Sequence, residues 1–266
     1  MNAILGVIFL AAVTLFTATI FRDIGLGMVI NPDAVIIVGG GTLVAVFLAF
    51  PMKRLKTTAY DIISAFRHQK SRQEMAEEIL EVARMYRRAD IRGLDIRTKT
   101  MKDDFLKLGV NLLINHQSND AIRKVMEREL TIRVMNSNFS QNVLKTVARL
   151  TPSFGLAGTV ISLIKMFKNM QSVDAIAPLM AVAMMSTLYG VIISNLFMLP
   201  LCAKLKERAI VTEVLMHITI EGLEAVNDGE HPLLIKERIL GCCEGMESLP
   251  QDAMHVLSVT KSGHGA

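Results

Sequence analysis

The stretch TPSFGLAGTVISLI, residues 151–164, decides the fold class of this chain. It is apolar enough to enter a membrane, yet it carries a proline, two glycines and hydroxyl side chains where a simple anchor would use leucine and valine. Helices that only anchor a protein have no need of such residues, because small and hydroxylated side chains serve close helix contacts or polar paths in lipid. This combination indicates a membrane segment that does more than anchor.

The rest of the composition agrees with a membrane protein. Of the 266 residues, 51% are hydrophobic and the mean hydropathy is +0.39, with the apolar content gathered in a few long runs. The net charge of +4 could indicate nucleic-acid binding, but a cytoplasmic excess of Lys and Arg gives the same balance. We therefore favour a membrane protein and expect no nucleic-acid partner.

No pattern for catalysis or metal binding stands out. Cys202, Cys242 and Cys243 lack metal-ligand spacing, and the six histidines form no HExxH motif. We expect no enzyme activity, no metal and no cofactor.

Four segments are apolar enough to cross a bilayer, which requires about 20 residues. They are residues 3–21, residues 34–50, the opening stretch extended back to residue 142, and residues 175–202. Basic residues crowd the polar segment that follows the second span, so the positive-inside rule places that segment in the cytoplasm. Both termini are then cytoplasmic, and the short connections 22–33 and 168–174 lie outside.

We therefore predict an all-α membrane protein with four transmembrane helices, a helical cytoplasmic head and a helical cytoplasmic tail. In EMAEEILEVARMYRR, the apolar residues Met75, Ile79, Val82, Ala83 and Tyr86 recur at helical spacing. Ser118 or Asn119 is expected to cap a later helix of the head. The predicted domains are residues 1–51 (first hairpin), 52–149 (head), 150–202 (second hairpin, ion path) and 203–266 (tail, with a disordered end).

None of the spans carries a central Asp or Glu, the usual proton or cation relay inside a membrane. If the protein conducts ions, the titrating carboxylate must come from another chain. The third and fourth spans are instead small and hydroxylated, which fits either helix packing or a polar track facing a partner helix. Their residues of this kind are Gly155, Gly158, Thr159, Ser162, Ser186, Thr187, Tyr189, Gly190 and Ser194.

Two further features allow two interpretations each. Pro152 and Pro200, near the cytoplasmic ends of these spans, are either hinges or ordinary helix terminators and kinks. In YRRADIRGLDIR, charged residues form either a solvated helix face or a docking surface. They are Arg87, Arg88, Arg92, Asp95 and Arg97.

Four segments together resemble the MotA/PomA family of flagellar stator A subunits. They are INPDAVIIVGGGTLVAVFLAFPMKRL, TPSFGLAGTVISLIKMFKNM, APLMAVAMMSTLYGVIISNLFMLPLCAKL and IEGLEAVNDGEHPLLI. The resemblance implies a multi-pass protein of the bacterial inner membrane in which five A subunits surround two B subunits. The B subunits (MotB/PomB) supply the ion-binding Asp, and the A-subunit heads push on the rotor protein FliG.

The resemblance also implies roles for individual residues. Thr159, Ser186 and Thr187 are expected in the ion path, and Pro152 and Pro200 in coupling ion binding to movement. Arg87, Arg88 and Asp95 are expected to face the rotor, and Gly155, Gly158 and Gly190 to pack helices. Where the family has a leucine and often an acidic residue, this chain has Arg92 and Ile96, so its surface is more basic and its rotor or partner is open to question. The resemblance does not decide whether the transported ion is a proton or a sodium ion.

Two alternatives stay open at this point. A TolQ/ExbB-like or defence-associated motor would energise an envelope protein, although three spans are typical of TolQ/ExbB and the sequence predicts four. A membrane scaffold that moves no ions is the second alternative.

Overall fold

The computed structural model describes residues 31–67, 69–101, 103–170 and 173–247. The first predicted span, residues 3–21, and the end of the tail lie outside these residues. Every regular element in the described part is helical, and two of them are π segments. The all-α fold class is therefore confirmed.

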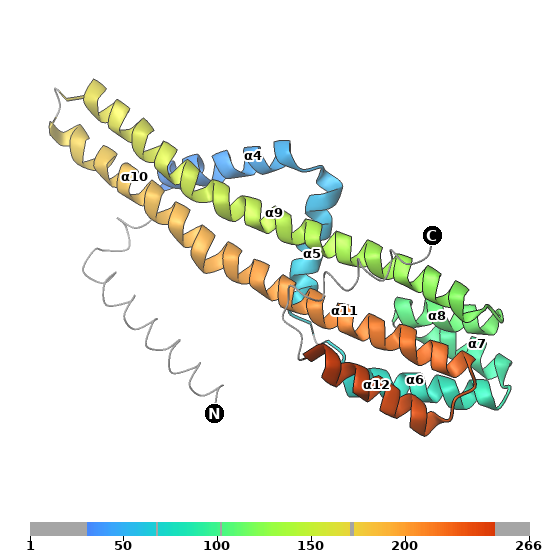
Figure 1. Ribbon diagram of the computed structural model, residues 1–266. Helices are drawn as coiled ribbons and strands as arrows, with labels where there is room; N and C mark the ends of the chain where they lie inside the picture. The colour runs from blue at the N-terminus through green and yellow to red at the C-terminus, as the bar shows by residue number, and fades with distance from the viewer. Residues whose placement is uncertain (1–30, 68, 102, 171–172, 248–266) are drawn as a thin grey trace, which may run out of the picture. The chain divides into compact units, whose positions relative to one another are not determined.

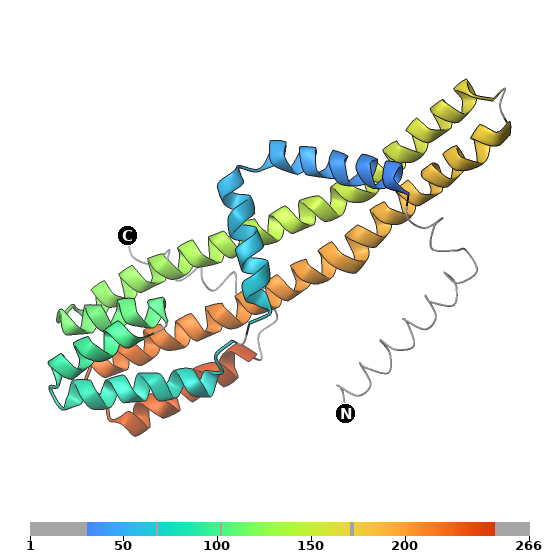
Figure 2. The ribbon, with the colours of Figure 1, turned by 180° about the vertical axis from the view of Figure 1, so that it is seen from behind.

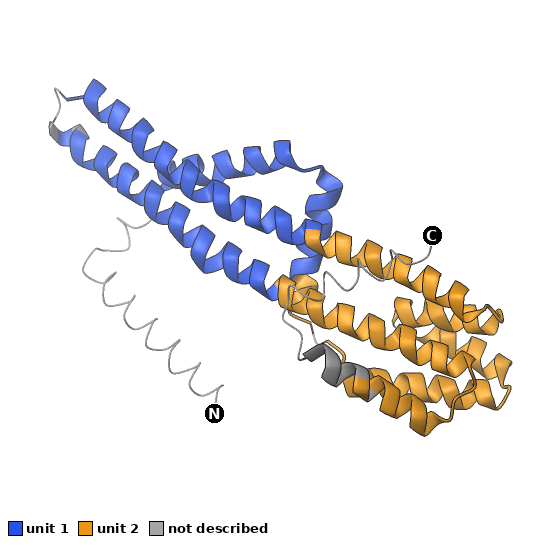
Figure 3. Cartoon of the chain, in the orientation of Figure 1, with its two compact units in different colours: residues 1–62, 139–204 blue, residues 63–138, 205–266 orange. Residues whose placement is uncertain are grey.

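The described residues form two compact units, each built from separate parts of the chain (Figure 3). Unit 1 comprises the described residues within 31–62 and 139–204, and unit 2 comprises those within 63–138 and 205–247. The regions predicted as head and tail thus contribute to one unit, and those predicted as two membrane hairpins contribute to the other. The boundaries between the units lie inside helices, and the division into membrane and cytoplasmic domains stays a prediction.

Unit 1 contains two long helical runs and a shorter one that packs beside them (Figure 1, Figure 2). The shorter run is α3 (Pro32–Val35), the π segment η1 (Ile36–Gly40) and α4 (Gly41–Ala49). The long runs are the later part of α9 (Asn119–Lys168), and α10 (Val173–Ile192) followed by the π segment η2 (Ile193–Met198) and the start of α11 (Leu199–Asn227).

Local sequence explains where the shorter run begins and ends. The Asn31 side chain accepts a hydrogen bond from the Ala34 N–H, and Pro32 occupies the first helical position, where its missing N–H costs nothing. At the other end Phe50 is extended, as expected for a residue before proline. The chain then turns into α5 (Met52–Ala65), which runs in a different direction from α4 (Figure 1).

Unit 2 is a bundle of helices around an apolar core. Its elements are α6 (Arg72–Arg87), α7 (Ile91–Thr100), α8 (Asp104–Ile114), the first part of α9, the later part of α11, and α12 (Pro232–Glu247). Ser71 and Glu74 form a capping box at the start of α6. Ser118 Oγ accepts from the Ala121 N–H at 3.4 Å, so the predicted cap of α9 is confirmed.

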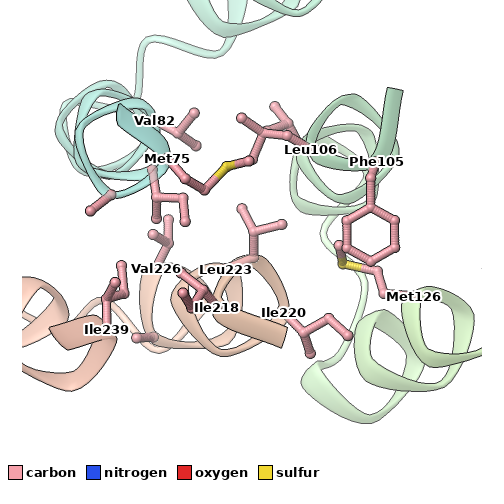
Figure 4. Close-up of a cluster of buried hydrophobic side chains, with 14 of the residues drawn as sticks. Met75, Val82, Phe105, Leu106, Met126, Ile218, Ile220, Leu223, Val226 and Ile239 are labelled. Carbon is pink, nitrogen blue, oxygen red and sulfur yellow. The ribbon is translucent and has the colours of Figure 1, made fainter. Parts of the chain in front are cut away.

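The predicted apolar stripe of α6 faces this core. Met75, Ile79, Val82 and Ala83 are buried, and Tyr86 packs partly buried against the cluster. Figure 4 shows side chains of α6, α8, α9, α11 and α12 pointing toward one another around Leu223. Burial of such side chains stabilises a fold by about 1.5–3 kcal/mol each, so this core is the main source of stability of unit 2.

Polar contacts join α9 and α11 within unit 2. Arg123 forms a bidentate ion pair with the nearly buried carboxylate of Glu224, and this hydrogen bonding raises the pKa of the Arg123 guanidinium. Where α9 begins and α11 ends, the Asn227 amide donates to Asn119 Oδ1 at 2.6 Å and to the Gln117 carbonyl at 3.2 Å.

Three helical runs in the described part are long and apolar enough to cross a membrane, lying within residues 32–49, 119–168 and 176–227. They overlap the predicted second, third and fourth spans. The third and fourth spans are portions of longer helices, since α9 alone has 50 residues.

Candidate functional site

The centre of unit 1 is a seam of small residues between α9 and α10. On α9 the buried residues Thr151, Gly155, Gly158 and Ser162 follow one another at helical spacing. A Cβ atom on Gly155 would lie 2.8 Å from the backbone oxygen of Ser186, and one on Gly190 would lie 2.9 Å from the backbone oxygen of Thr151. The two helices therefore touch backbone to backbone, as only glycine permits at these positions.

The shorter helical run packs against the same seam. A Cβ atom on Gly41 would meet the Phe154 ring at 2.5 Å, and one on Gly158 would lie 3.2 Å from the Ile37 side chain. The Tyr189 hydroxyl accepts a hydrogen bond from the Asn31 N–H at 2.9 Å and so fixes the start of this run against α10. Sequence reasoning did not single out Asn31, although an Asn followed by Pro is a recognisable helix start.

The three residues predicted for the ion path lie in different surroundings. Ser186 is fully buried against Gly158, and its hydroxyl donates to the Val182 carbonyl at 2.8 Å. Thr159 is half-buried and donates to the Leu156 carbonyl at 2.6 Å. Thr187 is also half-buried, and its Cα atom lies beside Gly155.

These positions determine what the hydroxyls can do. The donors of Ser186 and Thr159 serve their own helices, which leaves oxygen lone pairs as acceptors. Thr159 and Thr187 retain an open surface, whereas Ser186 is enclosed within the single chain. The two threonines are therefore the partly exposed members of the predicted set.

Pro152 and Pro200, the predicted proline pair, each lie where a helix departs from regular α-helical hydrogen bonding. Pro152 lies inside α9 and has no N–H to donate to the carbonyl of Ala148, one turn earlier. The buried Ser194 hydroxyl, from the π segment η2, donates to this carbonyl at 2.7 Å. Pro200 is the second residue of α11 and lies two positions after the end of η2. Sequence reasoning noted Ser194 as a small hydroxyl residue but did not find this contact, because its partner lies 46 residues away.

The predicted rotor-facing residues surround the α6–α7 turn. Arg87 ends α6, Arg88 caps it, and Asp90 caps α7 by accepting from the Gly93 N–H at 2.9 Å. Arg87, Arg88 and Arg92 are exposed and form no ion pair with another described residue.

Asp95 and Arg97 differ from these arginines. Asp95 pairs with Lys99 at 2.7 Å and Arg97 pairs with Glu81 at 2.9 Å. Apart from Asp90, whose carboxylate caps α7, the charged residues without an ion pair at the turn are the three arginines Arg87, Arg88 and Arg92.

Similarities to known proteins extend over nearly the whole chain. A family model described as the MotA/TolQ/ExbB proton channel family matches residues 97–218. Motility protein A of Aquifex aeolicus is 31% identical over 89% of this chain and 93% of its own length. Motility protein A of Bacillus subtilis is 27% identical over 90% of this chain and 89% of its own length.

A solved structure agrees with these relatives. The flagellar MotAB stator complex from Bacillus subtilis contains a chain that is similar to this one with a TM-score of 0.75 and 26% identity, over 94% of this chain and 96% of that chain. Sequence and fold thus match over the same extent. The chain therefore belongs to the motility protein A group of the MotA/TolQ/ExbB proton channel family.

Proposed function

We propose that this chain is the A subunit of a flagellar motor stator, which couples ion flow through the inner membrane to torque on the rotor. The observation that carries the proposal is the match to motility protein A over 89% of this chain and 93% of the relative. The likeness to a chain of the Bacillus subtilis MotAB complex supports it. The relatives do not favour a TolQ/ExbB-like role.

The proposed topology has four spans with both termini in the cytoplasm. Residues 3–21 supply the first span, and the three apolar helical runs of the described part supply the others. The basic segment after the second span supports its cytoplasmic location.

In the proposed ion path a B-type partner supplies the titrating Asp, since the spans of this chain carry no central carboxylate. Thr159 and Thr187 present oxygen acceptors to the ion or to the partner's Asp when it carries a proton. Ser186 lies in the seam against Gly155 and Gly158, where it sets the spacing of α9 and α10. The transported proton or sodium ion is the only small ligand that we propose, with no separate cofactor or metal.

Movement and torque complete the proposal. Pro152 and Pro200 flank the place where Ser194 replaces a backbone hydrogen bond, which favours a bend there as the partner's Asp changes charge. Five copies around two B subunits give the assembly. Arg87 and Arg88, with Asp95 beside them, contact FliG or a rotor protein of similar role, and the extra Arg92 favours an acidic surface on that protein.

The first experiment is deletion of the gene. We expect cells that assemble flagella but do not swim, and recovery of swimming when the full chain is supplied from a plasmid. Normal swimming by the deletion strain, in the absence of a second stator, would rule out the proposed function.

The second experiment tests the rotor contact. Reversing Arg87 and Arg88 to Glu should lower swimming speed severely while the A and B subunits still co-purify. The matched control reverses Lys124 and Arg128, two exposed cations of the same unit that form no ion pair with another described residue. Equal speeds for both double variants would remove Arg87 and Arg88 from the rotor contact.

A further inference from the structure

Three turns lie at one end of unit 2, on the right in Figure 1 and on the left in Figure 2. They follow α6, α8 and α11, and each contains a residue with a positive φ angle: Ala89 at 57°, His116 at 52° and Gly229 at 72°. Only glycine adopts this conformation freely, so the backbone is strained at Ala89 and His116. A strained turn keeps its conformation when neighbouring contacts hold it in place.

The side chain of Asn227, the last residue of α11, contacts the other two turns. Its amide nitrogen donates to Asn119 Oδ1 at 2.6 Å and to the Gln117 carbonyl at 3.2 Å, both beside the α8–α9 turn. Its Oδ1 atom accepts a hydrogen bond from the Tyr86 hydroxyl at 3.3 Å, just before the α6–α7 turn. Asn119 donates in turn to Asp228 Oδ1 at 2.6 Å. One side chain therefore joins all three turns.

The amide of Asn227 suits this place because it both accepts and donates. Its oxygen serves Tyr86 on α6, and its nitrogen serves Asn119 on α9. Aspartate could only accept, and leucine could do neither. All three residues are half-buried, so water competes less for these bonds than on an open surface. Tyr86 also packs against the core of unit 2, which limits where its hydroxyl can point.

The hold on the α6–α7 turn matters for the two arginines that follow Tyr86. Arg87 and Arg88 are exposed, and no carboxylate among the described residues pairs with them. The direction of their side chains is therefore set by the backbone of the turn. A turn that is already held in place presents these charges without first paying to order them, which strengthens contact with a partner surface.

We propose that Asn227 is a positioning residue for the rotor contact. Through Tyr86 it holds the α6–α7 turn against the start of α9 and the end of α11, so that Arg87 and Arg88 meet the rotor protein in one orientation. The proposal rests on the proposed function for its partner, whereas the hold on the turn is a property of the chain itself. A failure of the proposed function would appear in the deletion strain, and a failure of this proposal in the two measurements below.

Hydrogen–deuterium exchange measures the hold on the turn in the full-length chain, purified with its B subunit and without a rotor. Tyr86→Phe removes only the hydroxyl. Loss of one ordinary hydrogen bond should speed exchange at residues 88–91 by about two- to tenfold. Asn227→Ala should act at least as strongly, and adding Tyr86→Phe to it should change nothing further, because the partner of the hydroxyl is already gone. Unchanged exchange in both single variants would overturn the proposal.

Thr212→Val is the matched control. Thr212 is also half-buried on α11, about four helical turns before the end of that helix, and accepts a hydrogen bond from Gln69 Nε2 at 3.0 Å. Its loss removes a side-chain contact of the same kind in the same unit. The variant should therefore lose a similar amount of stability and leave exchange at residues 88–91 unchanged.

Torque per stator unit tests the role in the rotor contact. The speed of a motor that turns a heavy load rises by one step for each stator unit that joins, so the height of the steps is compared with their number. Tyr86→Phe should lower the height, because a poorly directed contact weakens every unit. Thr212→Val should lower at most the number, because a less stable chain supplies fewer units. Equal step heights for the two variants, despite faster exchange at the turn in Tyr86→Phe, would overturn the positioning role.

Discussion

The α9/α10 seam of unit 1 and the core of unit 2 hold helices together in opposite ways. In the seam, glycines and hydroxyl residues let backbones touch, and large apolar side chains such as Leu156 and Met184 point outward, 60% and 69% exposed. In the core, large side chains such as Ile79, Leu106 and Leu223 are fully buried.

The proposed topology, with unit 1 in the bilayer and unit 2 in water, explains the difference. Lipid tails are as apolar as leucine, so helices in a bilayer gain little by burying leucine and associate through close packing and hydrogen bonds. In water, burial of apolar area dominates. Four substitutions test this contrast, from the largest expected effect to the smallest.

Leu223→Ala should have the largest effect. Leu223 is fully buried, and its Cδ1 atom occupies the space over Gly109. The lost burial and the cavity should lower the free energy of unfolding by about 2–5 kcal/mol, measured by denaturant titration of the full chain. Leu233→Ala, at a side chain that is 66% exposed, is the control and should change it little.

Gly155→Ala should act by overpacking. The added methyl group would lie 2.8 Å from the Ser186 backbone oxygen, which cannot move aside, so we expect a loss of about 1–3 kcal/mol and weaker co-purification with the B subunit. Gly39→Ala adds the same methyl group where nothing lies within 4 Å and should be neutral or stabilising. If both variants behaved alike, close packing would not hold the seam together.

Ser194→Ala should have a smaller effect on stability. It removes the donor to the Ala148 carbonyl, and hydrogen bonds between membrane helices contribute about 0.6 kcal/mol on average and at most about 1.7 kcal/mol. Ser153→Ala is the control, because that exposed hydroxyl only bonds within α9. A swimming defect with little loss of stability would indicate that the contact acts in movement.

Asp95→Asn should have the smallest effect. The exposed pair with Lys99 spans one helical turn, so its loss should cost about 0.3–0.5 kcal/mol in the same titration. Swimming speed is the second measurement. A large loss of speed at unchanged stability would support a rotor contact for Asp95. Normal speed would mean that Asp95 only forms the ion pair with Lys99.

In unit 2, sequence patterns predicted the individual helices better than the contacts between them. The stripe from Met75 to Tyr86 identified the buried side of α6 because helical periodicity is a local property. The pairing of Arg123 with Glu224 joins residues 101 positions apart, and no spacing rule connects them.

In unit 1 the sequence showed which residues are small but not which of them touch. Gly155, Gly158 and Gly190 were predicted to pack helices, and each lies against another helix of the same chain. Ser186 and Thr187 are neighbours in sequence, yet one is enclosed and the other half open, because adjacent residues of a helix point about 100° apart. The predicted third span does run through Pro152, but the sequence could not show which donor satisfies the Ala148 carbonyl, since that donor is a hydroxyl from a different helix.

The bond from Ser194 to the Ala148 carbonyl has a consequence for how this sequence can change over evolutionary time. The serine is needed only while residue 152 has no N–H, because any other residue there would restore the bond within α9. Loss of Ser194 should therefore lower the stability of the protein when residue 152 is proline and change it little in a Pro152→Ala background. The two positions form an epistatic pair, and lineages that replaced the proline first would be free to vary the serine afterwards.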